Sequence, residues 1–230
     1  MAERPARPNL LIVMTDHQRA DSVLPEHPAV TPNVGRLFEQ GLAFTSTLCP
    51  TPHCCPTRAS FFSGLYPSRH GVWNNICNDQ ALSRGPRPGV RLWSEDLAEA
   101  GYNLHYTGKW HVSVEDSPVD RGFTEHSICG AAGDHHGRRW EQYRQQAAEP
   151  EPTERGEGEI LRPGYGAYRL YGTRPDDRNT GDDRFTEEAV EVIPSLAAGD
   201  DPWGLFVGLT GPHDPYFVPQ QYIDLYDLDD

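Results

Sequence analysis

The stretch PNLLIVMTD, residues 8–16, decides the fold. Its apolar run is about as long as one strand and lies between a proline and a polar Thr-Asp pair, which is typical of a strand buried on both faces. Such strands belong to parallel sheets, and open α/β sheets bind ligands at the carboxyl ends of their strands. We therefore expect this strand to deliver Asp16 to a binding edge.

Helical patterns with an N-cap residue and a glycine stop alternate with further strand patterns along the chain. The predicted helices are TPNVGRLFEQG (31–41), SEDLAEAG (94–101) and TEEAVEVI (186–193), and the predicted strands are residues 102–107 and the run WGLFVGLTG that begins at Trp203. Thr31 and Ser94 are the expected N-caps. This alternation predicts an α/β fold with a mainly parallel sheet and helices on both faces.

Residues between about 112 and 182 are rich in Gly, Arg, Asp, Glu and Pro and lose all periodicity. We expect a surface excursion near the site, with a helix possible at RWEQYRQQAA (139–148). A chain of 230 residues is long enough for one sizeable core, so one domain is expected.

The net charge of -14, without any Lys- or Arg-rich run, excludes a nucleic-acid surface or a polybasic membrane contact. The apolar run NLLIVM is too short to span a bilayer, and MAERPARP before it lacks the apolar region of a signal peptide. The cysteine count of five is odd, which argues against a disulfide framework. These features predict a cytoplasmic protein.

The stretch CCPTRASFFSG predicts a helix that begins at Cys54 and Cys55 and ends at Gly64. A helix N-terminus carries partial positive charge, so it activates a cysteine or binds an oxyanion there, and Arg58 adds a cation. Two other interpretations stay open: the cysteines are buried small hydrophobes, or they form a zinc knuckle with nearby Cys and His residues. No matching CxxC or HxxxH downstream supports the zinc interpretation.

The segment PHCCPTRAS, followed by GLYPSRHG, resembles the sulfatase signature, which that family writes as Cys-X-Pro-Ser-Arg within the alkaline-phosphatase-like superfamily. Four other blocks are similar to the family's blocks and occur in the family's order: PNLLIVMTDHQRAD, TPNVGRLFEQGLAF, YTGKWHV and LTGPHDPYFVP. Thr57 replaces the usual serine of the signature and keeps a hydroxyl group. His17 stands where many members have a second aspartate.

The resemblance implies that a maturation enzyme oxidises Cys54 to formylglycine (3-oxoalanine), whose hydrated aldehyde attacks the sulfur of a small sulfate ester. After sulfate transfer, the remaining hydroxyl can expel the sulfate, so no water needs to attack the hindered sulfur. The resemblance also implies a Ca²⁺ or Mg²⁺ ion held by oxygen-bearing groups at Asp16, at the modified Cys54 and, more loosely, by His17.

Lys109 and His111 lie two residues apart, so they share one face if the chain is extended there. Lys109 is the only lysine of the chain, and an ammonium group suits a crowded tetrahedral oxyanion better than a flat guanidinium does. By resemblance, His213 contacts the sulfate or protonates the leaving alcohol. His70 and Asn74 have no assigned role, and the adjacent histidines His135 and His136 are expected in a solvated loop.

The family's pattern continues past Asp230, so residues 1–230 are expected to be the N-terminal part of a sulfatase catalytic domain, with a sheet that is incomplete at the C-terminus. Two alternatives remain: a phosphate or phosphonate ester hydrolase of the same superfamily, and a non-catalytic fragment in which Cys54 stays a thiol. The acidic balance favours small substrates over long polyanions. The natural substrate and the oligomeric state are left open.

Overall fold

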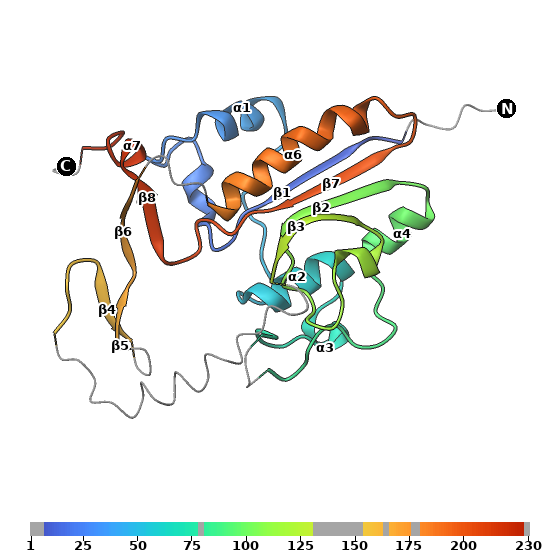
Figure 1. Cartoon of the computed structure of the whole chain (residues 1–230), viewed down its shortest axis with the longest axis horizontal. Helices are drawn as coiled ribbons and strands as arrows, with labels where there is room; N and C mark the ends of the chain where they lie inside the picture. Colours follow the sequence, from blue (N-terminus) through green and yellow to red (C-terminus); the bar gives the residue numbers. More distant parts are fainter. Residues whose placement is uncertain (1–6, 78–80, 131–153, 163–165, 176–179, 228–230) are drawn as a thin grey trace. The chain divides into compact units, whose positions relative to one another are not determined.

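The computed structural model describes residues 7–77, 81–130, 154–162, 166–175 and 180–227 (Figure 1). The chain divides into two compact units. The first unit comprises Met1–Thr15, Cys49–Gln142 and Asn179–Thr210, and the second comprises Asp16–Leu48, Tyr143–Arg178 and Gly211–Asp230.

A four-stranded sheet forms the centre of the first unit. Its order is β1 (Leu10–Met14), β7 (Trp203–Gly208), β2 (Asn103–Lys109) and β3 (Thr124–Cys129). Every pair of neighbours is parallel. The predicted parallel sheet is therefore confirmed, with the first predicted strand lying beside the last one.

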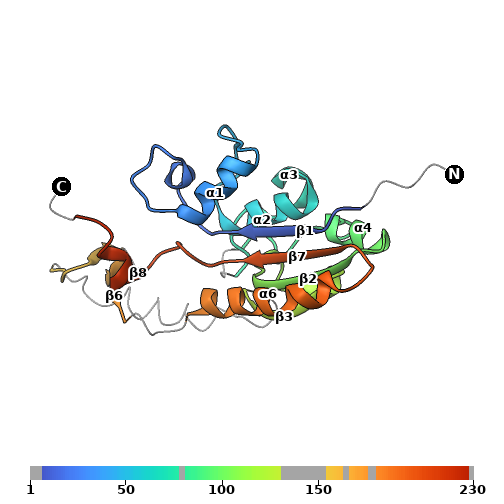
Figure 2. The same ribbon diagram turned by 90° about the horizontal axis from the view of Figure 1, so that it is seen from above.

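Helices cover both faces of this sheet, as Figure 2 shows. On one face α6 (Gly181–Ala197) packs Ala189 and Leu196 against Leu205 and Val207. The opposite face is covered by α2 (Cys54–Ser63) and α4 (Trp93–Glu99), with the short helices α3 (Pro67–His70) and η2 (Pro118–Arg121) in the same unit. The predicted α/β class with helices on both faces is confirmed.

An aromatic cluster fills the core between α2, α4 and the sheet. Phe62 of α2 stacks on Trp93 of α4, with ring centroids 5.3 Å apart, and lies 5.1 Å from Phe206 of β7. Phe206 in turn stacks on Tyr106 of β2 at 4.8 Å. Burial of large rings gives such a cluster most of its stabilising energy, so this face of the sheet fixes the position of α2.

Glycine is required where β2 and β7 approach each other most closely. A Cβ atom at Gly108 would lie 2.0 Å from the carbonyl oxygen of Gly208, and the φ of Gly108 is +99°. Both the space and the backbone conformation exclude a side chain there.

The strand β1 is at an edge of the sheet in the described part of the chain, and α6 leaves one of its faces bare. Leu11 and Val13, which point to the same face, are 53% and 58% exposed. An exposed apolar edge strand is a site of association between chains.

The second unit contains the helix that the sequence predicts most fully. α1 spans Pro32–Gln40, with Thr31 at the N-cap and Gly41 at the C-cap. The other elements are η1 (Ala20–Val23), the antiparallel pair β4 (Glu159–Arg162) and β5 (Gly166–Arg169), the parallel pair β6 (Tyr171–Arg174) and β8 (Tyr216–Pro219), and α7 (Gln220–Ile223).

The structure differs from the prediction at the start of α4. Leu92, not Ser94, is the N-cap, and its backbone N–H donates to the Glu95 carboxylate at 2.8 Å. Trp93 is drawn into the aromatic cluster, so the helix begins before Ser94, which is fully buried.

The region between residues 112 and 182 also contains more regular structure than its composition indicates. The strand β3 lies within it and completes the sheet on the side of β2. The helix expected at residues 139–148 lies outside the described residues. None of the helices that the structure describes is both long and apolar enough to cross a bilayer.

Candidate active site

The two adjacent cysteines at the start of α2 occupy different environments. Cys54 is the first residue of the helix and is half-buried, whereas Cys55 is fully buried and its backbone N–H donates to Asn75 Oδ1 at 3.2 Å. Burial raises the pKa of the Cys55 thiol far above its usual range. Cys55 is therefore an inert core residue, and Cys54 is the cysteine that a reagent can reach at the positive end of the helix.

The hydroxyl of Thr57 holds the first turn of α2 to the preceding loop. Its Oγ1 donates to the carbonyl of Thr51 and lies 3.0 Å from Cys49 Sγ. Threonine at this position thus has a local structural role. Among the described residues, no three His, Cys, Asp or Glu side chains, Cys49 and His53 included, lie together as a metal-ligand group.

Arg58 connects α2 to the end of β2. Its side chain is only 2% exposed, and its Nη1 donates to the carbonyl of Lys109 at 2.5 Å. The hydroxyl of Tyr106 donates to the same oxygen at 2.6 Å. Burial raises the pKa of Tyr106, so the hydroxyl stays protonated and remains a donor. The backbone of Lys109 is therefore held from two sides.

The backbone turns sharply directly after Lys109, which is the last residue of β2. The N–H of His111 donates to the carbonyl of Gly130 at 2.8 Å, and His111 has a φ of 54°. The chain is not extended at His111. The alternation of side chains along a strand therefore does not put the His111 side chain on the same face as Lys109. Its side chain is 9% exposed, and its buried Nδ1 has no hydrogen-bond partner within the described residues. Such an unsatisfied buried atom is typical of a ligand-binding position.

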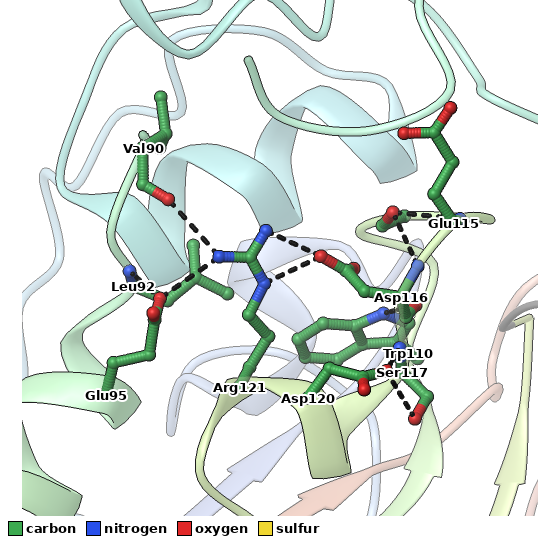
Figure 3. A network of polar contacts seen from close by, with 10 residues as sticks. Val90, Leu92, Glu95, Trp110, Glu115, Asp116, Ser117, Asp120 and Arg121 are labelled. Carbon is green, nitrogen blue, oxygen red and sulfur yellow. Dashed lines mark hydrogen bonds and ion pairs between the residues drawn. The ribbon is translucent and has the colours of Figure 1, made fainter. Parts of the chain in front are cut away.

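A polar network holds the loop that follows His111 (Figure 3). Arg121 donates through Nε to Asp116 Oδ2 at 2.7 Å and through Nη1 to Glu95 Oε2 at 3.1 Å. The indole N–H of Trp110 donates to the backbone carbonyl of Asp116 at 3.1 Å. The network links α4, η2 and the loop, so Lys109 and His111 lie on a fixed backbone.

The other predicted site residues, Asp16, His17 and His213, lie in the second unit, and the two histidines lie beside Asp214. His213 Nδ1 lies 2.7 Å from the backbone carbonyl of Asp214 and 3.3 Å from its Oδ1. His17 Nδ1 is 3.8 Å from the same Oδ1, and the rings of His17 and His213 are 5.5 Å apart. Because a carbonyl only accepts, Nδ1 of His213 carries a proton and donates it to this bond, so Nε2 is the other ring nitrogen.

Asp214 was missed in the sequence, although it follows His213 directly between two prolines. A carboxylate beside a candidate acid or base is a recognisable signal, because it orients the imidazole. Asp214 therefore joins the set of candidate residues.

The side chains fit a hard divalent cation only in part. Asp16 is a carboxylate that is 8% exposed, and its backbone N–H donates to Gly211 at 3.1 Å. A buried carboxylate is a ligand that Ca²⁺ or Mg²⁺ prefers. No three His, Cys, Asp or Glu side chains in the described ranges converge on one point, so these residues supply only part of such a ligand set.

Two residues that the sequence left without a role are structural. His70 is fully buried; its Nδ1 accepts from the N–H of Val72 at 3.1 Å, so its Nε2 donates to Ser60 Oγ at 2.9 Å. Burial, aided by Arg87, lowers the pKa of His70. Asn74 Oδ1 accepts from a backbone N–H at 3.0 Å. The pair of histidines at 135 and 136 lies outside the described residues.

Comparison with known proteins identifies relatives over nearly the whole chain. The family model described as Sulfatase matches residues 8–229. An uncharacterized sulfatase, YidJ, of Escherichia coli is 28% identical over 229 residues, and the choline-sulfatase of Rhizobium meliloti is 28% identical over 230 residues. Each alignment covers 96% of this chain and 41% of the relative. The chain thus spans less than half the length of these relatives.

Solved structures share the fold. The putative sulfatase yidJ from Bacteroides fragilis has a TM-score of 0.68 and 23% identity, and the alignment covers 97% of this chain and 48% of that one. The phosphonate monoester hydrolase of Agrobacterium radiobacter has a TM-score of 0.63 and 22% identity, covering 97% of this chain and 45% of that one. At these identities the likeness concerns the fold alone.

Proposed function

Because the chain belongs to the sulfatase family, we propose that it is part of an enzyme that hydrolyses a sulfate monoester, with Cys54 as the residue from which the nucleophile is made. The observation that carries this proposal is the contrast at the start of α2, where Cys54 is half-buried and Cys55 is fully buried. Only Cys54 combines a helix N-terminus with access for a maturation enzyme and a substrate.

We further propose that the carboxyl edge of the four-stranded sheet, where Lys109 ends β2, is a ligand-binding edge. The parallel register pairs Met14 with Gly208 and Gly208 with Gly108, so the carboxyl ends of β1, β7 and β2 lie at one edge. Asp16 follows β1 by two residues, Lys109 ends β2, and His213 follows β7 in the chain. The carboxyl edge of a parallel sheet is the usual ligand-binding edge, which supports this assignment.

Each residue has a role that matches its surroundings. Formylglycine formed from Cys54 supplies the hydrated aldehyde as the nucleophile. By the family resemblance, Asp16, modified Cys54 and, more loosely, His17 would hold a Ca²⁺ or Mg²⁺ ion, whose charge would polarise a sulfate oxygen. Arg58 fixes the backbone of Lys109, whose ammonium group attracts the sulfate.

The two remaining histidines are assigned to proton transfer and substrate contact. The buried Nδ1 of His111 has no hydrogen-bond partner among the described residues, so we assign it to a bond with a substrate oxygen or the nucleophile. His213 receives its orientation from Asp214, and we assign it to contact with the sulfate or to proton donation to the leaving alcohol.

A phosphate or phosphonate monoester hydrolase is the second candidate, because the fold also matches a phosphonate monoester hydrolase. The net charge of -14 favours small esters over long polyanions for either activity. Parallel assays with aryl sulfate, aryl phosphate and aryl phosphonate esters, on a protein that includes the remaining part of the family's length, separate the two candidates. Faster cleavage of the sulfate ester is the expected result.

The nucleophile is tested by co-expression with a formylglycine-generating enzyme and mass spectrometry of the peptide that contains Cys54. We expect conversion at Cys54, with reactivity toward a hydrazide, in the parent and in Cys55→Ala, and no conversion in Cys54→Ala. A thiol that persists at Cys54, while a known sulfatase is converted in the same cells, contradicts the proposal.

The isolated chain is expected to turn over substrate poorly. Its described residues supply only part of a metal-ligand set, and the chain spans 41% of the curated relatives' length. Turnover by the purified 230-residue chain at ordinary enzyme rates of about 1–1,000 per second would refute this expectation.

A further inference from the structure

Two tyrosines of the second unit lie side by side on an exposed face of a small parallel sheet. The strands β6 and β8, which Figure 1 shows next to each other, pair with Tyr171 opposite Tyr216 and Thr173 opposite Val218. Residues that are paired across neighbouring strands point to the same face of a sheet, so these four side chains share one face. All four are exposed, Tyr171 to 54% and Tyr216 to 38%.

The opposite face of this sheet carries contacts that hold the two strands together. A Cβ atom at Gly172 would lie 3.0 Å from the ring of Phe217, so this ring packs across the neighbouring strand. The guanidinium of Arg169 lies over the same ring, 5.7 Å from its centroid. The backbone N–H of Tyr216 donates to the carbonyl of Leu170 at 2.7 Å. The two tyrosines are therefore carried on a backbone that is held from behind.

The exposed face offers both apolar and polar groups to a ligand. No described residue forms a hydrogen bond with the hydroxyl of Tyr171 or Tyr216, and the hydroxyl of Thr173 lies on the same face. A tyrosine ring stacks through its flat surface and forms hydrogen bonds through its hydroxyl. A pyranose ring matches such a surface, because C–H groups line its flat faces and hydroxyl groups line its rim.

This face lies close in the chain to the residues assigned to the ester bond. Tyr216 follows His213 by three residues, so their Cα atoms are at most about 11 Å apart. Asp214, which orients His213, belongs to the same unit as both tyrosines. Whether His213 contacts the sulfate or protonates the leaving alcohol, the alcohol part of a bound ester begins beside it and extends over a distance of this order.

We propose that Tyr171 and Tyr216 bind the alcohol part of the substrate and that this alcohol is a pyranose sugar. The assignment rests on the proposed hydrolysis of a sulfate monoester and goes beyond it, because it names the class of alcohol and two residues that select it. A platform of two rings on an open face suits one or two sugar rings, which agrees with a small substrate.

Other small alcohols match this face less well. Proteins bind a quaternary ammonium such as that of choline in a cage of aromatic rings, whereas Tyr171 and Tyr216 lie on one open face. An alkyl chain gains affinity from an enclosed apolar pocket and leaves the two hydroxyls without partners. An aryl group can stack on the rings but also leaves the hydroxyls unused.

The experiment measures the binding of sulfate esters to the 230-residue chain by saturation-transfer NMR at pH 7. The probes are the monosulfates of methyl glucoside and methyl galactoside, compared with phenyl sulfate, choline sulfate and butyl sulfate. We expect saturation transfer to the ring C–H protons of at least one sulfated pyranoside. Its binding should weaken about 5–10-fold in Tyr171→Ala and in Tyr216→Ala. Binding needs no conversion of Cys54, so its failure is distinct from a failure of the proposed nucleophile.

The matched control is Tyr222→Ala, because Tyr222 is also 54% exposed and belongs to the same unit but lies on α7. It should leave the binding of the pyranoside unchanged. Tyr171→Phe and Tyr216→Phe should keep most of the affinity, because the rings remain.

A measurement without substitutions decides the matter if an alanine variant melts at a lower temperature than the parent. Selective irradiation of the aromatic protons should saturate the pyranoside, and this transfer should disappear when the protein is made with ring-deuterated tyrosine. Three results would overturn the proposal: no binding of any sulfated pyranoside, binding that is unchanged in both folded alanine variants, or a larger loss for phenyl, choline or butyl sulfate than for every pyranoside.

Discussion

Arg58 is a buried cation that donates to a backbone carbonyl of another element, at Lys109. Removing such a charged donor leaves a buried acceptor with one partner fewer, which costs about 1.5–3 kcal/mol. We predict that Arg58→Ala lowers the free energy of unfolding in urea by about this amount, as followed by tryptophan fluorescence. Arg58→Lys should recover part of the loss, because a cationic donor remains.

The matched control for Arg58 is Arg36→Ala. Arg36 belongs to α1, is exposed, and donates to the side chain of Asn33 at 2.8 Å. A surface contact of this kind contributes at most a few tenths of a kcal/mol. Equal decreases in the free energy of unfolding of the two alanine variants would mean that the bond from Arg58 to Lys109 contributes no more than a surface contact.

His70 makes stability depend on pH in a defined direction. Its folded pKa is lowered by burial, so the unfolded chain binds a proton more readily than the folded one does. Its contribution is complete above the unfolded pKa of about 6.5, and stability falls as the pH drops below it, by at most about 1.4 kcal/mol per unit. In His70→Gln this dependence should be absent. Parallel urea-stability profiles of the two proteins between pH 8 and pH 5 would contradict the prediction.

At the scale of elements, Glu188 fastens α6 to two strands of the sheet. Its Oε2 accepts from Thr107 Oγ1 of β2 at 2.8 Å and from the N–H of Ser127 of β3 at 3.0 Å. Burial alone would raise the pKa of Glu188, but the hydrogen bonds from Ser127 and Thr107 outweigh it and hold the pKa below its usual value.

We predict that Glu188→Gln destabilises the protein by about 1 kcal/mol at pH 7, since a partly exposed carboxylate acceptor is lost. Because the folded pKa is lowered, the stabilisation is present above the unfolded pKa of about 4.3 and is lost as the pH falls through the folded value. The difference in the free energy of unfolding between the parent and Glu188→Gln, measured in urea, should therefore disappear at acidic pH. Glu187→Gln, on the exposed face of α6, should have the same free energy of unfolding as the parent both at pH 7 and at acidic pH.

Strong local patterns in the sequence predict most of the fold. β1 and β7 are apolar runs, α1 has both caps, and α2 opens at the cysteines and ends at Gly64, so these elements were predictable. β3 was missed because its sequence, TEHSIC, is polar and half-buried, as suits an edge strand. No local sequence pattern identifies such a strand, because the residues it pairs with lie on β2, about twenty residues earlier in the chain.

The candidate site was predictable where a motif names the residue and not where distant contacts decide its role. The motif singled out Cys54, but the burial of Cys55 follows from packing in the core. The turn at His111 depends on a bond to Gly130, so alternation along a strand could not anticipate it. The hydrogen bond between the rings of His105 on β2 and His126 on β3 likewise depends on the register of two strands.

At the scale of the whole molecule, the bare face of β1 should make the isolated chain self-associate. Leu11 and Val13 are more than half exposed on an edge strand of the described sheet. A charge on such an edge discourages pairing between chains. We predict that Val13→Lys shifts concentration-dependent oligomers, measured by sedimentation velocity, toward monomer.

Val119→Lys is the control for this prediction, because Val119 is equally exposed, at 59%, but lies on η2 rather than on a strand. It should leave the sedimentation profile unchanged. A parent chain that stays monomeric at every concentration, or two lysine variants with the same effect, would contradict the role of the edge.

The close approach of Gly108 and Gly208 limits how the protein can be re-engineered. Even an alanine at 108 would force β2 and β7 apart, because its methyl group would meet a carbonyl oxygen at 2.0 Å. The displaced strand ends are the ones that hold Lys109 and lead toward His213. Saturation libraries aimed at new substrates should therefore spare both glycines and place their diversity in the loops beyond them.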